Sequence, residues 1–207
     1  MCLIIHKPAD ASIPEDLLAA AAAHNPDGWG LMGFAPDGRL LLERHATVDV
    51  AVVADTVRHW RDAEFVLHLR RQTRGGSGLE NVHPFKILDG LYLVHNGTLK
   101  LDVRVPGRSD TWHFVHDLLR PLAQRHPGLL SDHGFLRILE LGLKPENKLA
   151  LLDQRLRRIV VVNREHGVEL DGLWLSNTRW IDRARFPLSA APQPQERGYT
   201  ADEVQFA

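Results

Sequence analysis

The chain opens with Met1-Cys2-Leu3-Ile4-Ile5-His6, in which the only cysteine of the 207 residues directly precedes an apolar run. The run predicts a buried first strand. Removal of Met1 would place a thiol and a free α-amine on one residue, and such an amine titrates near ~8, low enough to accept the thiol proton. An N-terminal Ser, Thr or Cys can use its own amine as general base in this way. The alternative is that Cys2 merely opens a buried strand, because free cysteines are among the most buried residues.

Length and composition limit the class of protein. With 207 residues, 44% hydrophobic and 25% charged, the chain predicts one globular domain. A net charge of −1 and scattered Lys and Arg predict neither a nucleic acid nor a membrane as partner. One cysteine excludes an internal disulfide, and we see no signal peptide and no apolar run of about 20 residues. We therefore expect a cytoplasmic protein.

Apolar runs and turn signals predict the order of the elements. Helices are expected over 14–23, 49–61, 109–125 and 135–141, and strands over 2–6, 29–34, 39–43, 64–69, 91–94, 148–152, 158–162 and 173–175. Several strands adjoin through short turns, which favours two sheets with helices outside them. We expect one domain over 1–182 and an irregular C-terminal arm over 183–207.

Four polar clusters follow predicted strands or lie in the long polar segment 71–84, and segments of that length are usually functional or disordered. They are His68-Leu69-Arg70 with Thr73 and Gly75, then Asn81-Val82-His83-Pro84, then His95-Asn96-Gly97, and finally Ser109-Asp110-Thr111.

Together with Cys2, these clusters supply the groups that an amide-cleaving thiol enzyme needs. The Arg70 guanidinium offers a planar fork of donors for a carboxylate, and Asp110 could hold an ammonium group. The Asn96 side chain and the Gly97 main chain each offer an N–H for an oxyanion hole. A substrate with a carboxylate and an ammonium group at one end and an amide at the other is glutamine.

Each cluster also has a purely structural interpretation. Arg70 could pair with a surface carboxylate, and Asn96-Gly97 after a strand is typical of a hairpin turn. Ser109-Asp110-Thr111 makes a good helix cap with a favourable dipole partner. The joint occurrence of these clusters with Cys2 favours the functional interpretation.

On the order and spacing of Cys2 and the four clusters, the chain resembles the class II glutamine amidotransferases of the N-terminal nucleophile hydrolase superfamily. The resemblance covers residues 2 to about 111. It implies an α+β fold, a four-layer αββα sandwich of two antiparallel sheets. It also implies Cys2 as nucleophile and base, with Asn96 and Gly97 as the oxyanion hole. The substrate-binding residues that it implies are Arg70, Thr73, His95 and Asp110.

Two residues depart from the family pattern. Arg71 stands where many members carry Trp, and Arg74 where many carry His, both beside the substrate carboxylate. They bear on the preference for glutamine rather than on the acyl-transfer chemistry. Asp27-Gly28-Trp29-Gly30 also resembles a loop of stand-alone members that include γ-glutamyl hydrolases, and as local structure it predicts a tight turn into a strand with an anchoring tryptophan.

The resemblance implies hydrolysis of the glutamine side-chain amide through a γ-glutamyl thioester, with release of glutamate and ammonia. One alternative is a γ-glutamyl hydrolase acting on a γ-glutamyl peptide or amine, and a second is a non-catalytic module that binds glutamine or a partner. We expect a small-molecule substrate and consider a separate ammonia-acceptor protein possible, because the fold needs the strands after Thr111.

Other signals are weak. Among the twelve histidines, His113 and His116 share a predicted helix face but lack a third ligand, so we expect amphipathic or solvated side chains, no metal and no cofactor. The segment 75–78 lacks the Lys-Ser or Lys-Thr of a phosphate loop, and a flexible cover over the site is expected instead. Serine catalysis by Ser109, with His95 and Asp110, lacks the Gly-x-Ser-x-Gly motif.

Overall fold

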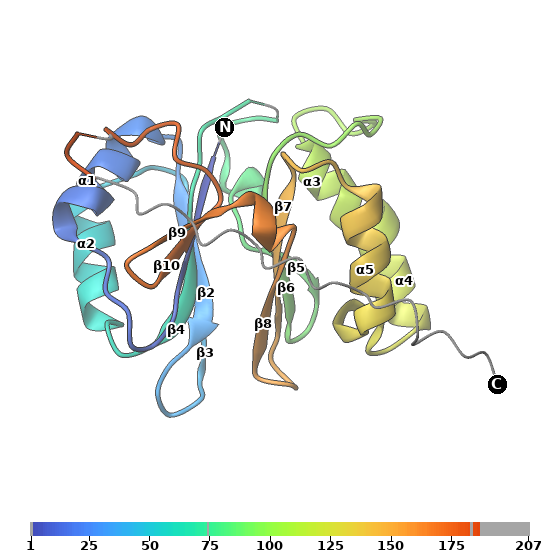
Figure 1. Cartoon of the computed structure of the whole chain (residues 1–207). Coiled ribbons are helices and arrows are strands. Elements are labelled where there is room, and N and C mark those ends of the chain that lie inside the picture. Colours follow the sequence, from blue (N-terminus) through green and yellow to red (C-terminus); the bar gives the residue numbers. More distant parts are fainter. Residues whose placement is uncertain (1, 74, 183, 187–207) are drawn as a thin grey trace, which may run out of the picture.

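A computed structural model describes residues 2–73, 75–182 and 184–186. Within them, two antiparallel sheets stack face to face with helices on both outer sides (Figure 1). The first sheet has the order β3-β2-β4-β1-β10-β9, and the second has the order β5-β6-β7-β8. This is the predicted four-layer α+β sandwich, and the prediction is confirmed.

The strands of the first sheet are β1 (Leu3–Lys7), β2 (Trp29–Phe34), β3 (Leu40–His45), β4 (Glu64–Leu69), β9 (Val168–Leu170) and β10 (Leu173–Leu175). Those of the second are β5 (Phe85–Leu88), β6 (Leu91–Asn96), β7 (Lys148–Asp153) and β8 (Arg158–Val162). The sequence analysis missed β5 and β9. Both are short edge strands whose apolar residues are too few to show a period.

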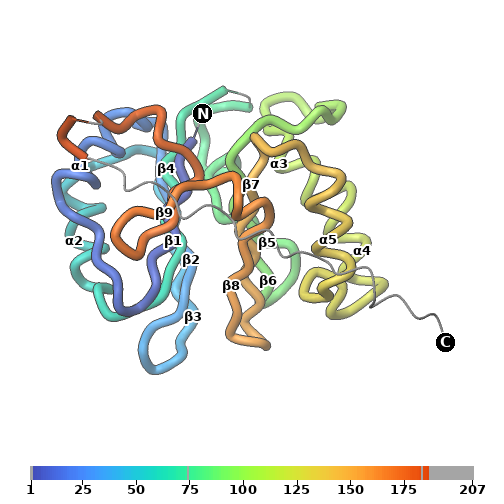
Figure 2. Tube along the Cα trace, in the orientation of Figure 1, coloured from blue at the N-terminus to red at the C-terminus, as the bar shows by residue number. Residues whose placement is uncertain are grey.

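Helices α1 (Glu15–His24) and α2 (Val50–His59) cover the first sheet, and α3 to α5 cover the second (Figure 2). Helix α3 (Asp110–His113) continues through a wide π turn at 114–119 into α4 (Arg120–Arg125), and α5 is His133–Gly142. The prediction of a single helix over 109–125 is therefore right in extent but missed the π turn.

Three apolar cores hold the layers together. One lies between α1, α2 and the first sheet, and another lies between α3 to α5 and the second sheet. The third fills the space between the sheets, with Ile4, Val66 and Trp174 from one sheet and Val94 and Ala150 from the other. Strands β1 and β6 are thus buried on both faces, which explains their nearly continuous apolar sequences.

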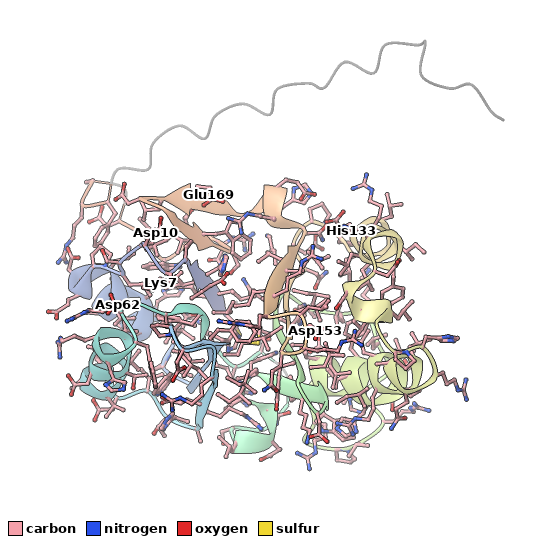
Figure 3. All side chains as sticks on the ribbon, turned by 90° about the horizontal axis from the view of Figure 1, so that it is seen from below. Lys7, Asp10, Asp62, His133, Asp153 and Glu169 are labelled. Atoms are coloured by element: carbon pink, nitrogen blue, oxygen red, sulfur yellow. The ribbon has the colours of Figure 1, made fainter. Side chains whose placement is uncertain are left out.

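The two ends of the sandwich differ in chemistry. Figure 3 views the molecule from below, where Lys7 lies near Asp10 and Asp62. The Lys7 side chain is buried, and its Nζ donates to the carbonyl oxygens of Pro8, Ala9 and Ala63. Burial lowers the pKa of Lys7, and the two carboxylates partly oppose that effect. This end is closed by main-chain carbonyls, whereas β1 begins beside Cys2 at the other end.

Part of the sequence analysis falls on residues outside this description. The predicted C-terminal arm over 183–207 does so except for 184–186, and Met1 and Arg74 do so as well. In the part of the chain that is described, no helix combines the length and the apolar character needed to cross a bilayer.

Candidate active site

Cys2 is partly buried at the start of β1, beside the residues that follow β4. Its Sγ lies 3.4 Å from both the main-chain nitrogen and the carbonyl oxygen of Arg71. Burial raises the pKa of the Cys2 thiol, although the Arg71 N–H and the charge of Arg70 act in the opposite direction. The thiol is therefore protonated at neutral pH, and a reaction at this sulfur requires a base.

Strand β6 carries Asn96 to the same end, because its last residue pairs with the first residue of β7, Lys148. The Asn96 side chain is 1% exposed and points across to the first sheet, where its Nδ2 lies 2.7 Å from Ser176 Oγ. The next residue, Asn177, donates from Nδ2 to the Cys2 carbonyl oxygen at 2.8 Å. The chain after β10 therefore contacts both Asn96 and Cys2.

Gly97 follows Asn96 with a φ of +147°, a conformation that side chains rarely adopt. A Cβ atom at this position would lie 2.3 Å from Asn147 Oδ1. Asn96-Gly97 is not a hairpin turn, because β6 pairs with β5 and β7 and the chain leaves Gly97 for a long connection to α3. The turn interpretation considered from the sequence is therefore wrong.

Arg70 directly follows β4 and is 4% exposed. Its guanidinium donates to the carbonyl oxygens of Gly76, at 2.8 Å, and Asp27, at 3.4 Å. It therefore joins the loop after β4 to the turn before β2. Thr73, three residues further along, is exposed on the loop.

The turn before β2 has the predicted shape. Gly28 adopts a φ of +114°, and Trp29 is buried as β2 begins, with its ring stacked on His45 at 4.4 Å. Asp27 Oδ2 accepts from the Gln72 N–H at 2.8 Å. The turn therefore supports the loop that carries Thr73.

Asp110 is the first residue of α3, behind the N-cap Ser109, whose side chain accepts from the Trp112 N–H. The Asp110 carboxylate is buried and accepts from the main-chain N–H groups of Leu99, at 2.7 Å, and Thr111, at 2.9 Å. The predicted cap is confirmed. The helix N-terminus and main-chain N–H groups are favourable partners for a carboxylate at this position.

His95 lies under this carboxylate, between Thr111 Oγ1 at 2.8 Å and Asn147 Oδ1 at 3.1 Å. Because the Asn147 oxygen can only accept, His95 donates from Nε2 and accepts the Thr111 hydroxyl at Nδ1. Burial lowers the pKa of His95, while the Asp110 charge raises it. His95 therefore links β6, α3 and the residue before β7.

Two further histidines from the polar clusters, His68 and His83, are buried next to one another with ring centres 4.2 Å apart. None of their four ring nitrogens has a partner with full hydrogen-bond geometry among the described residues, although the His95 main chain lies close enough to oppose the lowering of the His68 pKa. Burial, together with the charges of His95 and Arg70, lowers the pKa of His68 to about 3, and the pKa of His83 is also well below 6.5. Both rings are neutral at physiological pH.

Asn81 ties the segment 71–84 to the connection before α3. Its Oδ1 accepts from the Ser109 N–H at 2.8 Å, and its Nδ2 donates to the carbonyl oxygens of Gly76 and Gly107. The segment 75–78, expected to be a flexible cover, is thus held at Gly76.

His113 corrects the expectation of an amphipathic or solvated histidine. Its side chain is 1% exposed, donates from Nδ1 to the Ser109 carbonyl oxygen, and accepts at Nε2 from the N–H groups of Arg104 and Val105. His116 is half-buried against the Trp112 ring. Among the residues described, no group of three His, Cys, Asp or Glu side chains is arranged to hold a metal ion.

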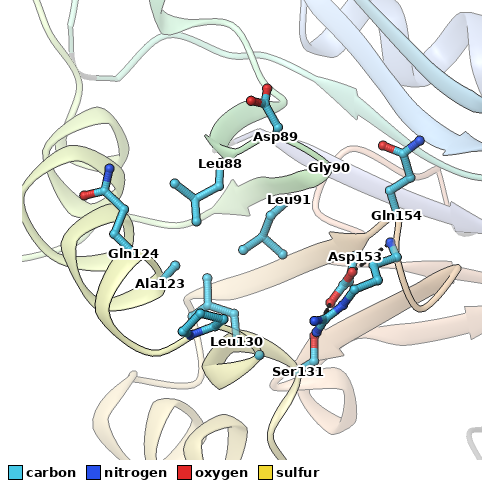
Figure 4. A pocket seen from close by; sticks show the side chains of 13 residues that line it. Leu88, Asp89, Gly90, Leu91, Ala123, Gln124, Leu130, Ser131, Asp153 and Gln154 are labelled. Atoms are coloured by element: carbon cyan, nitrogen blue, oxygen red, sulfur yellow. Dashed lines mark hydrogen bonds and ion pairs between the residues drawn. The ribbon is translucent and has the colours of Figure 1, made fainter.

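Figure 4 shows a cavity of about 650 Å³ whose lining includes none of these residues. It is lined by Leu91, Ala123, Leu130 and Asp153, among others. Leu91 pairs with Asp153 at the end of β6 and β7 opposite Asn96 and Lys148, a separation of about 17 Å along five strand residues. The cavity therefore has no part in the predicted site.

The structure places every predicted site residue at one end of the sandwich, on β1, β4, β6, α3 and the loops next to them. Comparison with known families gives a match to the model of the class-II glutamine amidotransferases over residues 2–146. The chain belongs to the class II glutamine amidotransferases. These are enzymes with an N-terminal cysteine nucleophile, and Cys2 stands at that position.

A solved structure shows the same fold. The glutamine phosphoribosylpyrophosphate (PRPP) amidotransferase from B. subtilis, complexed with ADP and GMP, is similar to 87% of this chain with a TM-score of 0.52 and 14% identity. The match covers 42% of that protein, so this chain spans less than half the length of its structural relative. No curated protein matches the chain.

The sequence analysis missed three residues of this region, namely Asn147, Ser176 and Asn177. Asn147 directly precedes β7, and Ser176 and Asn177 directly follow β10, all outside the clusters that carry the family resemblance. A Ser-Asn pair after a strand is also common in ordinary loops, so nothing in the local sequence distinguishes it.

Proposed function

We propose that this amidotransferase domain hydrolyses the side-chain amide of glutamine, with Cys2 as nucleophile and its own α-amine as base after Met1 is removed. The observation that carries the proposal is the pairing of Cys2 and Asn96 through consecutive residues, Ser176 and Asn177. This arrangement sets the thiol and a carboxamide at one end of the sandwich, as attack on an amide requires.

The proposed reaction has two halves. Cys2 Sγ attacks the amide carbon while its proton passes to the α-amine, and the Asn96 amide and the Gly97 N–H stabilise the resulting oxyanion. The C–N bond then breaks, the proton passes to the leaving amine, and a γ-glutamyl thioester remains. Water attacks the thioester, so that glutamate leaves and the thiol is restored.

Arg70 and Asp110 are the proposed anchors for the substrate carboxylate and ammonium group. Arg70 is held by two main-chain carbonyls, and Asp110 by two main-chain N–H groups. Both charges are therefore fixed before substrate binds, which lowers the entropic cost of orientation. Thr73 and His95 are proposed to complete the binding site.

A γ-glutamyl peptide or amine is the second candidate substrate, and Arg71 favours it. The Arg71 side chain is exposed beside Cys2, where its Nη1 lies 2.9 Å from His24 Nε2, and it has no carboxylate partner among the described residues. Burial and the nearby Arg71 charge lower the pKa of His24. A cationic rim of this kind suits a leaving group that carries a carboxylate.

The test is release of ammonia or glutamate by the purified protein from glutamine, glutathione and other γ-glutamyl amides. Intact mass first shows whether Met1 has been removed. We expect Cys2→Ala to abolish turnover, because the chain has no other cysteine. The glutamine-like electrophile 6-diazo-5-oxonorleucine should add once to the wild type and not to Cys2→Ala.

Wild-type turnover by Cys2→Ala would show the proposed mechanism to be wrong. Binding of glutamine without turnover by a protein that lacks Met1 would instead favour a non-catalytic binding module. Turnover of γ-glutamyl peptides but not of glutamine would select the second candidate.

A further inference from the structure

We propose that Ser176 is a positioning residue that turns the Asn96 carboxamide so that its N–H faces the substrate carbonyl. This inference rests on the proposed function and adds to it a residue beyond the part of the chain that the family match covers. Ser176 follows β10, is 0% exposed, and lies opposite Ile4 at the start of the inter-sheet core.

The first observation is the set of hydrogen bonds around the Ser176 hydroxyl. Its oxygen accepts from the Ile4 N–H at 2.9 Å and lies 2.7 Å from the Asn96 carboxamide. The main-chain N–H of Ser176 in turn donates to the Ile4 carbonyl oxygen at 2.9 Å. The hydroxyl is therefore fixed by β1, and Asn96 is the side chain closest to it.

The second observation is a carboxamide with one unpaired end. With Nδ2 toward Ser176, the Asn96 Oδ1 is buried and has no hydrogen-bond partner among the described residues. A buried carbonyl oxygen without a donor is costly. In this orientation the hydroxyl oxygen accepts from Ile4, from Asn96 and, at 3.5 Å, from Asn177, while its own proton has no acceptor among the described residues.

Turning the carboxamide by 180° resolves both problems, because its two ends have the same shape. The Ser176 hydroxyl then donates to Asn96 Oδ1, and 2.7 Å is the usual length of an O–H···O hydrogen bond, whereas N–H···O bonds are longer. The Nδ2 group takes the unpaired position. A buried N–H without a protein partner is what an oxyanion hole requires before substrate binds.

The result is a chain of donors that runs from the Ile4 N–H to the Ser176 hydroxyl, then to Asn96 Oδ1, and ends at Asn96 Nδ2. Each hydrogen bond polarises the next in a buried setting, so the last N–H becomes a better donor. The residue that begins this chain lies two positions after Cys2. The start of β1 therefore positions both the nucleophile and the oxyanion donor.

The experiment is a double-mutant cycle on kcat with glutamine or the best γ-glutamyl substrate. We expect Ser176→Ala to lower kcat about 10-fold with KM unchanged, and Asn96→Ala to lower it about 10²- to 10³-fold. Because Ser176 acts through Asn96, adding Ser176→Ala to Asn96→Ala should lower kcat by less than about 2-fold. Raising the enzyme concentration about 1,000-fold keeps the slow variants measurable.

If Ser176→Ala lowers kcat by the same factor in the wild type and in Asn96→Ala, the proposal is overturned, because a purely structural effect of Ser176 does not depend on Asn96. An unchanged kcat for Ser176→Ala would overturn it as well. The matched control is Ser131→Ala, which removes a hydrogen bond of the same length, 2.7 Å to Asp153, at the far end of β7. It should leave kcat and KM unchanged.

A second pair of variants covers the case in which Ser176→Ala does not fold. Ser176→Thr and Ser176→Val have the same shape and differ only in the hydroxyl, so they disturb the packing equally. We expect the Thr variant to exceed the Val variant about 10-fold in kcat, and equal rates would contradict the proposal. If the wild type shows no turnover at all, the proposed function is wrong. The rate at which 6-diazo-5-oxonorleucine alkylates Cys2 then replaces kcat in the comparison of the Thr and Val variants.

Discussion

Gly97 combines an unusual backbone conformation with a proposed chemical role, that of a donor in the oxyanion hole. Its φ of +147° turns the chain sharply after β6, and Asn147 packs where a side chain would begin. Glycine is therefore required for two independent physical reasons.

We predict that Gly97→Ala destabilises the fold by about 1–3 kcal/mol, because the new Cβ meets Asn147 in a strained conformation. Turnover should fall further than stability explains, since the donor moves. Urea denaturation and kcat measure the two effects. The matched control is Gly142→Ala at the end of α5, where a Cβ meets no atom within 4 Å, and it should leave kcat unchanged. A Gly97→Ala protein with wild-type stability would contradict the strain argument.

At the scale of elements, the connection from Gly97 to α3 is held by a side chain of the helix that it precedes and by a side chain of the segment 71–84. The His113 ring accepts two main-chain N–H groups, those of Arg104 and Val105, and Asn81 donates to the Gly107 carbonyl oxygen. A connection without regular structure is thus given fixed partners. This brings Ser109 and Asp110 to the same end of the molecule as Arg70.

We predict that His113→Phe removes hydrogen-exchange protection from the Arg104 and Val105 amides, because the acceptor that they share is lost. Stability should fall by about 1–3 kcal/mol. Hydrogen exchange followed by mass spectrometry or NMR measures the effect.

The matched control for that experiment is His116→Phe, three residues further along the helix. His116 stacks on Trp112 and lies within hydrogen-bond distance of Arg120, and in the described part of the chain no hydrogen bond joins it to the connection. Unchanged protection in His113→Phe, or equal loss in both variants, would show that His113 does not hold the connection.

At the scale of the whole molecule, the sandwich encloses two neutral histidines that belong to the family motifs. His68 lies near the end of β4 and His83 lies just before β5. Their rings are therefore in contact where the first and second sheets approach each other. Burial makes protonation of either ring costly in the folded state. Protonation is free of that cost only after unfolding.

We predict that stability falls as the pH drops below 6.5. Between pH 6.5 and the folded-state pKa of His68, about 3, the unfolded chain binds a proton that the folded chain does not. Each such histidine contributes about 1.4 kcal/mol per pH unit once the pH is well below 6.5. Urea denaturation from pH 7 to pH 4.5 measures the slope.

Replacing one buried histidine should reduce that slope by one proton, so we expect a shallower dependence for His68→Leu. His133→Gln, at an exposed position in the first turn of α5, is the control and should keep the wild-type slope. A wild-type slope in His68→Leu would show that His68 is protonated in the folded protein.

The sequence by itself predicted two sheets with helices outside them, and its motifs identified the family, whose resemblance implied the four-layer fold. Apolar runs such as 64–69 and 148–152 correctly predicted strands, because a strand that is buried on both faces has a nearly continuous apolar sequence. The order of Cys2, Arg70, Asn96 and Asp110 identified the family, because each of these residues belongs to a motif that is contiguous in the sequence. The roles assigned to these residues stay predictions until the variants are measured.

The tertiary structure alone decided which distant residues meet. Ser176 and Asn177 contact Asn96 and Cys2 only because β10 pairs with β1 and the two sheets stack, and nothing in their local sequence encodes that meeting. His113 is likewise buried by a connection whose path no periodicity describes. Local patterns report the burial of a segment, whereas contacts between segments depend on the packing of the whole chain.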